Sequence, residues 1–291
     1  MNRLMRSMGF NRIVQISRPR FWIYVAGTYA LGCLLAALQS DAPFAVIRPD
    51  TVAFLIYFLL PANLLIYGVN DIFDYETDRL NAKKVEYEAL VAPAEHRGLI
   101  EWIALLTAPF LLLLMSAPQE AVFSFLAFLL FAVFYSAGPI RAKTTPFLDC
   151  LISSSIYITP AVFGFHLAGG AGVDPMVLIA GYAWASAMHA YSAVPDIGAD
   201  RSSGTATVAT FLGRTATLVF CAALYTLATI IAYRWLGVPG AILGAVYVGV
   251  MSVSLMRRDE SLFQLYKAFP LLNSFSGMVI FIWLIAMAYF G

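Results

Sequence analysis

Charged side chains are scarce in this sequence. Of the 291 residues only 12% are charged and 61% are hydrophobic, whereas a soluble domain carries about 25% charged residues. So few polar side chains cannot cover a surface that faces water, which excludes an ordinary soluble globular protein. Lipid must be the solvent, and we predict an integral membrane protein.

Cysteine and basic clusters are scarce as well. The three cysteines, Cys33, Cys150 and Cys221, are isolated in apolar stretches and form no CxxC pair. This spacing supports neither a disulfide framework nor a thiolate metal site. The formal net charge is only +1 and no basic run occurs, so we expect no nucleic-acid partner.

Long hydrophobic runs, in contrast, recur along the whole chain. Nine stretches come close to the roughly 20 residues that a helix needs to cross a bilayer. They cover residues 21–39, 51–70, 99–117, 119–137, 147–168, 176–195, 207–233, 238–256 and 271–290. The length suits one compact bundle, so we predict an all-α protein with nine transmembrane helices and a single domain over residues 1–291.

The basic residues orient this bundle in the membrane. With the N-terminus in the cytoplasm, alternate loops fall inside, and all of the 18 basic residues except Arg48 and Arg234 lie in or next to them. Cytoplasmic loops carry an excess of Lys and Arg, so this sorting supports both the orientation and the count of nine.

A first acidic cluster follows the second predicted span. If that span continues as helix, Asp71, Asp74 and Asp78 lie at positions i, i+3 and i+7, and Asn70, Asp74 and Asp78 at i, i+4 and i+8. Each set lies on one helical face. Stacked carboxylates repel one another unless a cation joins them, and oxygen ligands suit Mg²⁺.

A second acidic cluster, Asp196 and Asp200, follows the sixth predicted span. The two carboxylates lie one helical turn apart, and the predicted topology places them at the same membrane face as the first cluster. Ionisable groups at the edge of apolar spans are costly and tend to be functional. We predict that the two clusters hold two Mg²⁺ ions around a pyrophosphate.

Cations that suit a phosphate occur on the same predicted face. The candidates are Lys83, Lys84, Arg141, Lys143, Arg201 and Arg214. The simpler explanation, a topology signal, is preferred for Arg3, Arg6, Arg257 and Arg258. The polar segment 72–98, rich in both signs of charge, is predicted to form a cytoplasmic lid over the site.

Two further polar residues lie within predicted spans. Asp149 begins the fifth span, and Arg141 or Lys143 is its expected partner, which would make it an orienting residue beside the site. His189 lies seven residues before Asp196 and can share its helical face. We interpret His189 as a packed or water-bonded histidine.

The acidic clusters resemble the motifs of the UbiA-type intramembrane prenyltransferases. Residues 70–78 match the NDxxDxxxD pattern, Asp196 and Asp200 match DxxxD, and residues 135–143 match YS-x-x-P-x-R-x-K. Arg18-Pro19 before the first span is also typical of that family. The likeness extends over roughly residues 17–214.

The resemblance implies a fold, a chemistry and a location. Nine helices would surround a central lipid-accessible cavity at the cytoplasmic side of a prokaryotic inner (plasma) membrane. Asn70, Asp74 and Asp78 would hold one Mg²⁺ with Asp71 beside them, and Asp196 and Asp200 would hold the second. Residues implied to contact the pyrophosphate of the prenyl donor are Lys83, Arg141 and Lys143, and Lys84 and Arg201 are further candidates by position. The acceptor would be a lipophilic molecule in the bilayer.

A narrower likeness indicates the acceptor. Residues 17–27, 67–74 and 80–84 resemble the lycopene elongases, so we expect transfer from dimethylallyl pyrophosphate to lycopene or a related carotenoid. A quinone or another aromatic or lipid acceptor is the alternative. Its support is weaker because no Arg-Pro pair follows Lys83 and Ser192 stands where many quinone-type members have tyrosine.

Two other classes of protein compete with this interpretation. An ion-coupled secondary transporter also uses intramembrane aspartates, but its sites usually lie near the bilayer midplane in broken helices. A lipid head-group phosphotransferase also needs Mg²⁺ and aspartates, but its DG-x-x-A-R signature is absent from the sequence.

Overall fold

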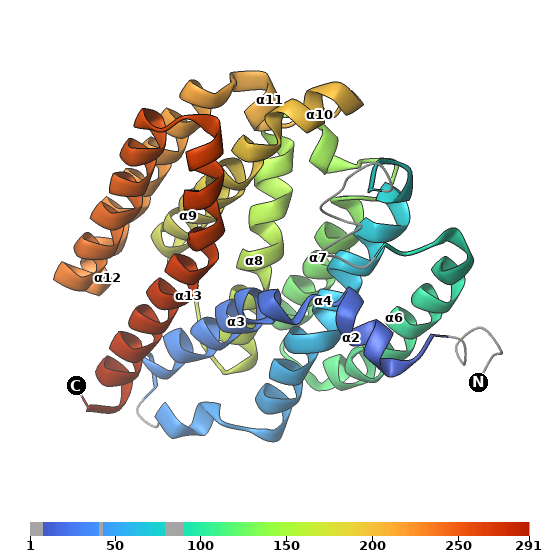
Figure 1. Ribbon diagram of the computed structural model, residues 1–291. Helices are drawn as coiled ribbons and strands as arrows, with labels where there is room; N and C mark the ends of the chain where they lie inside the picture. The colour runs from blue at the N-terminus through green and yellow to red at the C-terminus, as the bar shows by residue number, and fades with distance from the viewer. Residues whose placement is uncertain (1–7, 41–42, 79–89, 291) are drawn as a thin grey trace. The chain divides into compact units, whose positions relative to one another are not determined.

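The computed structural model describes residues 8–40, 43–78 and 90–290, and every regular element in these ranges is helical (Figure 1). The helices are α2 (Phe10–Ile16), α3 (Trp22–Ala37), α4 (Pro49–Asp78), α6 (Pro93–Leu113), α7 (Gln119–Phe134), α8 (Leu148–Leu167), α9 (Pro175–Ala193), α10 (Ile197–Ser203), α11 (Val208–Leu212), α12 (Arg214–Met256) and α13 (Asp259–Phe290). The predicted all-α class is therefore confirmed for the described part of the chain.

Six helices are long and apolar enough to cross a membrane, by length and composition. They are Pro19–Ala37, Pro49–Glu76, Pro93–Ser116, Leu148–Leu167, Arg214–Met256 and Gln264–Phe290, and Gln119–Phe134 is a shorter apolar helix. Each overlaps a predicted span, and Arg214–Met256 overlaps two. The count of nine transmembrane helices stays a prediction.

The 43 residues of α12 form two antiparallel limbs, drawn in orange in Figure 1. Gly237 bends the helix with φ 53° and ψ −139°, a conformation that costs glycine little because it has no Cβ. The rings of Tyr225 and Tyr247 then stack with centroids 4.7 Å apart, whereas a straight helix would separate them by roughly 30 Å. A Cβ on Gly244 would lie 1.9 Å from Thr229 Oγ1, so glycine permits the close approach of the limbs.

The start of the predicted span 207–233 needs a correction. Residues 208–212 form the separate short helix α11, and α12 begins only at Arg214. Gly213, with φ 76°, separates the two helices, because this left-handed backbone cannot continue a helix.

The chain gathers into two compact units. Unit 1 comprises residues 1–141 and 159–171, and unit 2 comprises residues 142–158 and 172–291. The single domain expected from the length stays a prediction.

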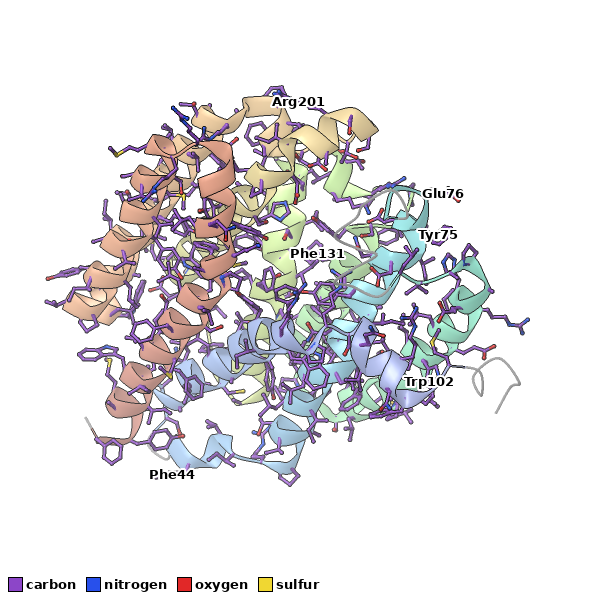
Figure 2. The ribbon with its side chains drawn as sticks, in the orientation of Figure 1. Phe44, Tyr75, Glu76, Trp102, Phe131 and Arg201 are labelled. Atoms are coloured by element: carbon purple, nitrogen blue, oxygen red, sulfur yellow. The ribbon has the colours of Figure 1, made fainter. Side chains whose placement is uncertain are left out.

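Unit 1 is built on α4. Aromatic rings fill its core, where Phe54 of α4 lies 4.6 Å from Phe163 of α8 and Tyr57 lies 4.9 Å from Phe125 of α7, between ring centroids. The short helix α2 packs across α4 and α6 through Ile13, Ile16 and other apolar side chains. Figure 2 shows Trp102 of α6 beside this contact. Unit 1 thus holds the long helix α4 on several sides.

In unit 2, α9 packs against the second limb of α12. Tyr191 Oη lies 3.1 Å from Ser254 Oγ, and the rings of Trp184 and Tyr247 meet edge to face. Tyr247 in turn donates a 2.8 Å hydrogen bond to Asn273 of α13. Tyrosine hydroxyls that reach polar partners satisfy their hydrogen-bonding needs inside an apolar bundle, so these bonds fix how the helices of unit 2 pack.

Candidate active site

The first acidic cluster lies on the last turns of α4. This helix passes the predicted span end at residue 70 and continues to Asp78, as the acidic spacing requires. Asn70 Nδ2 donates hydrogen bonds to Asp74 Oδ2 at 2.8 Å and to Ser136 Oγ at 3.1 Å. Figure 2 shows Tyr75 and Glu76 on the same turns. The helix thus presents Asn70 and Asp74 on one face; the side chain of Asp78 lies outside the described part.

Arg141, the last residue of the first segment of unit 1, joins this cluster. Its Nη2 lies 3.4 Å from Asp74 Oδ1, and its backbone has φ 41°. The Asp74 side chain is only 12% exposed, whereas that of Arg141 is 44% exposed. Ser136 and Arg141 of the motif segment 135–143 therefore both lie at the end of α4. Arg141 can donate hydrogen bonds to an anion there, next to the carboxylate oxygen atoms of the cluster.

Asp71 has a different environment from Asp74. It is buried, and Arg18 Nη2 donates a 2.7 Å hydrogen bond to its Oδ1. The guanidinium also lies 4.5 Å from the centre of the Tyr67 ring. Arg18 itself is held with φ 52° between α2 and the turn that starts α3. This ion pair fastens the N-terminal segment to α4, and the predicted role of Asp71 beside the metal ligands stays a prediction.

Part of the predicted site falls on residues 79–89. Lys83 and Lys84 lie outside the described residues, as does the middle of the predicted lid 72–98. The ends of that segment are helical, with residues 72–78 in α4 and residues 93–98 in α6. The lid itself stays a prediction.

The second acidic cluster lies at the start of a short helix in unit 2. Asp196 ends the 3-10 turn Val194–Asp196 and occupies the N-cap position of α10 without a side-chain capping hydrogen bond, and Asp200 lies in the first turn of α10. The helix ends at Gly204, whose φ of 72° is left-handed. The one-turn spacing predicted for the two aspartates is thus present, although on a separate seven-residue helix.

The basic residues of unit 2 differ in their contacts. Arg201 is exposed (Figure 2) and donates a 3.2 Å hydrogen bond to the carbonyl of Thr210 in α11. Arg214 donates to the carbonyls of Ser254 and Arg257, joining the ends of the two α12 limbs. Lys143 lies in the 3-10 turn Ala142–Thr144. Two of these cations therefore bind backbone carbonyls within unit 2.

The carboxylate of Asp149 has other hydrogen-bond partners than predicted. It is fully buried, and it accepts hydrogen bonds from the backbone N–H groups of Cys150 (2.8 Å) and Val208 (2.9 Å). His189 Nε2 lies 3.5 Å from Oδ2. Two backbone donors and an imidazole, rather than Arg141 or Lys143, are the partners that the structure gives this carboxylate. Sequence reasoning missed the pair because the two residues lie on different helices.

The residues of the two acidic clusters fit a magnesium ion chemically. Each cluster offers oxygen donors one helical turn apart, without sulfur or imidazole among them, as Mg²⁺ prefers. Asp149, Cys150 and His189 also lie close enough together to share an ion. There, however, backbone N–H groups already occupy both carboxylate oxygens, so the acidic clusters are the better candidates.

Comparisons with known proteins agree with these motifs. The profile of the UbiA prenyltransferase family matches residues 25–261. A protein named lycopene elongase/hydratase from Haloarcula japonica is 36% identical, with 92% of this chain and 88% of that protein covered. A protein of the same name from Haloferax volcanii is 38% identical, with 91% and 85% covered.

Solved structures share the fold at low identity. A UbiA homolog from Archaeoglobus fulgidus, described as bound to GPP and Mg²⁺, has a TM-score of 0.66 and 16% identity, and the match covers 95% of this chain and 99% of that one. A UbiA homolog from Aeropyrum pernix has a TM-score of 0.67 and 19% identity, with 90% and 98% covered.

Proposed function

This chain belongs to the UbiA prenyltransferase family and is a prenyltransferase; from that premise we propose that it transfers a dimethylallyl group from its pyrophosphate to lycopene or a related carotenoid. The observation that carries the acceptor is the 36% identity over 92% of the chain with a lycopene elongase/hydratase. The donor is supported by a neighbouring UbiA homolog described as bound to DMAPP and Mg²⁺.

The proposed metal ligands are the oxygen donors of the two acidic clusters. Asn70, Asp74 and Asp78 hold one Mg²⁺, and Asp196 and Asp200 hold a second. When bound there, Mg²⁺ would supply the positive charge that neutralises the pyrophosphate as a leaving group. We infer that the two clusters serve one pyrophosphate, because the distribution of basic residues predicts the same membrane face for both.

The side chains around Asp74 position the donor. Ser136 orients Asn70 by accepting its amide N–H, and Arg141 lies beside Asp74, where it can donate to a pyrophosphate oxygen. Arg18 neutralises Asp71 and fixes the end of α4. The negative charge of the pyrophosphate is further neutralised by contacts that we propose with Lys83, Lys84, Lys143 and Arg201.

The hydrocarbon interior of the protein protects the reactive intermediate. Breaking the allylic C–O bond leaves a carbocation or something close to one, which water would quench, so the reacting carbons need a dry pocket. Aromatic faces stabilise such a cation by about 2 kcal/mol each when desolvated. Tyr67 is not free for this task, since the Arg18 guanidinium already lies over its ring.

The acceptor then supplies the electrons. A terminal double bond of a polyene attacks the allylic cation without prior deprotonation, unlike a phenol, and a new C–C bond forms. The acceptor is a membrane lipid component, which enters from the bilayer. We propose that the donor binds from the cytoplasm at the plasma membrane, where the positive-inside rule places both clusters.

Turnover by the purified protein in liposomes tests this function. Dimethylallyl pyrophosphate is offered with lycopene and, in parallel, a long prenyl pyrophosphate with 4-hydroxybenzoate, each with Mg²⁺ or a chelator. We expect C45 and C50 carotenoids only with Mg²⁺ and only from lycopene. Product from the aromatic acid alone would overturn the carotenoid acceptor, and cation-driven uptake without any prenyl product would overturn the transferase.

Matched variants separate metal binding from folding in that assay. Asp74→Asn and Asp196→Asn remove one proposed ligand from each cluster, whereas Asp174→Asn changes the N-cap of α9, where asparagine also caps a helix. We expect the first two variants to lose product and the third to keep it. Equal losses in all three would contradict the proposed ligands.

A further inference from the structure

A line of polar contacts crosses the interface of α8 and α9 within unit 2. The three pairs are Asp149 with His189 (3.5 Å), Ser154 with Ser186 (2.8 Å) and Ser155 with Tyr182 (3.1 Å). We call these six side chains the α8–α9 polar seam. Polar groups are expensive inside apolar spans and tend to serve a function there.

The imidazole is not needed to satisfy the buried carboxylate. Backbone N–H groups already donate to both oxygens of Asp149, one from Cys150 and one from Val208. His189 is therefore an additional polar group at a fully buried anion, and its own side chain keeps 14% of its surface exposed while that of Asp149 keeps none. An imidazole with one edge at a carboxylate and some surface accessible is arranged for proton transfer.

We propose that the α8–α9 polar seam binds the water that ends the reaction and that His189, oriented by Asp149, accepts the proton of that water. This assignment rests on the proposed function. His189 is the catalytic residue in this step, and Asp149 is a positioning residue. The relatives named lycopene elongase/hydratase make a hydration step relevant to this chain.

The position of His189 along α9 matches the step. It lies seven residues before Asp196, which corresponds to roughly 10 Å of helix. The pyrophosphate is proposed to bind at Asp196, and the carbons that react lie a few bonds beyond it in the hydrocarbon. A base below the acidic cluster is therefore at the level of the acceptor rather than of the pyrophosphate.

The proton balance of the step is complete. After the new C–C bond forms, a tertiary carbocation remains on the acceptor. A lone pair of the water oxygen forms the C–O bond, one O–H bond breaks, and its proton goes to the imidazole of His189. Asp149, whose Oδ2 lies 3.5 Å from Nε2, orients the ring for this transfer. No oxidant or reductant is required.

The hydroxyl groups of the seam hold the water in place. Ser154 and Ser155 also donate to the backbone carbonyls one turn earlier in α8, so their lone pairs point toward α9 and its hydroxyl groups. Such a chain of hydroxyl groups offers a single water both donors and acceptors in an otherwise dry interior. Without the water, the same cation loses a proton from a neighbouring C–H bond and yields an alkene.

The test measures the ratio of hydroxylated to alkene products by mass spectrometry, because this ratio does not depend on how much enzyme is active. Wild type, His189→Gln and Asp149→Asn are compared in liposomes with dimethylallyl pyrophosphate and lycopene. We expect the ratio to fall at least tenfold in His189→Gln and less in Asp149→Asn. His166→Gln, a histidine of unit 1 beside the Gly170 carbonyl, is the matched control with an unchanged ratio.

The outcomes separate the two proposals. Wild type that forms no prenylated carotenoid overturns the proposed function itself. Wild type that forms only alkene products leaves the function standing and overturns the inference. An unchanged ratio in His189→Gln, with reduced yield, assigns the seam a purely structural role and also overturns it. Melting temperatures of all variants in detergent accompany the assay.

Discussion

The two acidic clusters have the same spacing but are built on different supports. Asn70 and Asp74 lie on α4, a 30-residue helix that packs against other helices of unit 1. Asp196 and Asp200 lie at the start of α10, which has only seven residues between a 3-10 turn and a left-handed glycine. A long packed helix fixes its side chains, whereas a short helix depends on its caps.

Their contacts differ in the same sense. Within unit 1, Asn70, Asp74, Ser136 and Arg141 already contact one another. In unit 2, the turn that follows the second cluster is held by hydrogen bonds from Val208 to Asp149 and from Arg201 to Thr210. We conclude that the side chains of the first cluster are pre-organised, whereas the position of the second cluster depends on a loop that the rest of unit 2 holds in place.

The largest effect is expected from removing one carboxylate of the pre-organised cluster. Asp74→Asn should lower pyrophosphate release roughly 10²–10³-fold, the loss typical of one preorganised electrostatic group in an active site, because the remaining oxygens cannot move to compensate. Asp196→Asn should lose less, and raising the Mg²⁺ concentration should restore part of its rate. Initial rates over a Mg²⁺ series measure both. Equal losses with no response to Mg²⁺ would remove the distinction between the clusters.

Breaking the support of the first cluster should come next. Arg18→Ala leaves Asp71 buried without its guanidinium, which should cost about 3 kcal/mol of stability. Asp71→Asn should cost less, because the neutral amide needs no counter-ion. Thermal unfolding in detergent measures the difference, and combining the two substitutions should recover part of the loss. If Arg18→Ala melts like wild type, the ion pair does not hold α4.

The smallest effects concern the support of the second cluster. Gly204→Ala forces a Cβ into a left-handed backbone and should destabilise the end of α10 by about 1 kcal/mol. Gly198→Ala is the matched change within α10, where a Cβ would meet nothing within 4 Å, and it should stabilise the helix by roughly 0.5–1 kcal/mol.

The KM for the prenyl donor and the melting temperature of each glycine variant are the readouts. Gly204→Ala should raise the KM a few-fold, while Gly198→Ala should leave it close to wild type and raise the melting temperature slightly. A larger rise of the KM in Gly198→Ala than in Gly204→Ala would mean that the Gly204 turn does not position Asp196 and Asp200.

Local patterns in the sequence predicted much of the fold and of the site. Hydrophobic length placed the helices. Asn70 and Asp74 share one face on the condition that the second span continues as helix, and α4 meets this condition because it extends to Asp78. Both features follow from residues near one another in the chain, where helical periodicity relates sequence to position directly. The family motifs extended the prediction to the chemistry of each cluster.

Other features depended on residues far apart in the chain. The partner of Asp149 was predicted to be Arg141 or Lys143, but the structure gives it Val208 and His189. The ion pair of Arg18 with Asp71 and the bend of α12 at Gly237 were likewise not foreseen. Periodicity shows which face of a helix a residue occupies, but not which other helix packs against that face.

The sequence by itself therefore determined that this is a membrane-type protein, where its helices lie, and which residue types are proposed to meet a pyrophosphate. These properties are set by composition and by contacts between neighbours in the chain. Only the tertiary structure decided which buried charges are paired and by what. Burial makes an unpaired charge costly, and its partner comes from the packing of distant helices, which no local pattern in the sequence specifies.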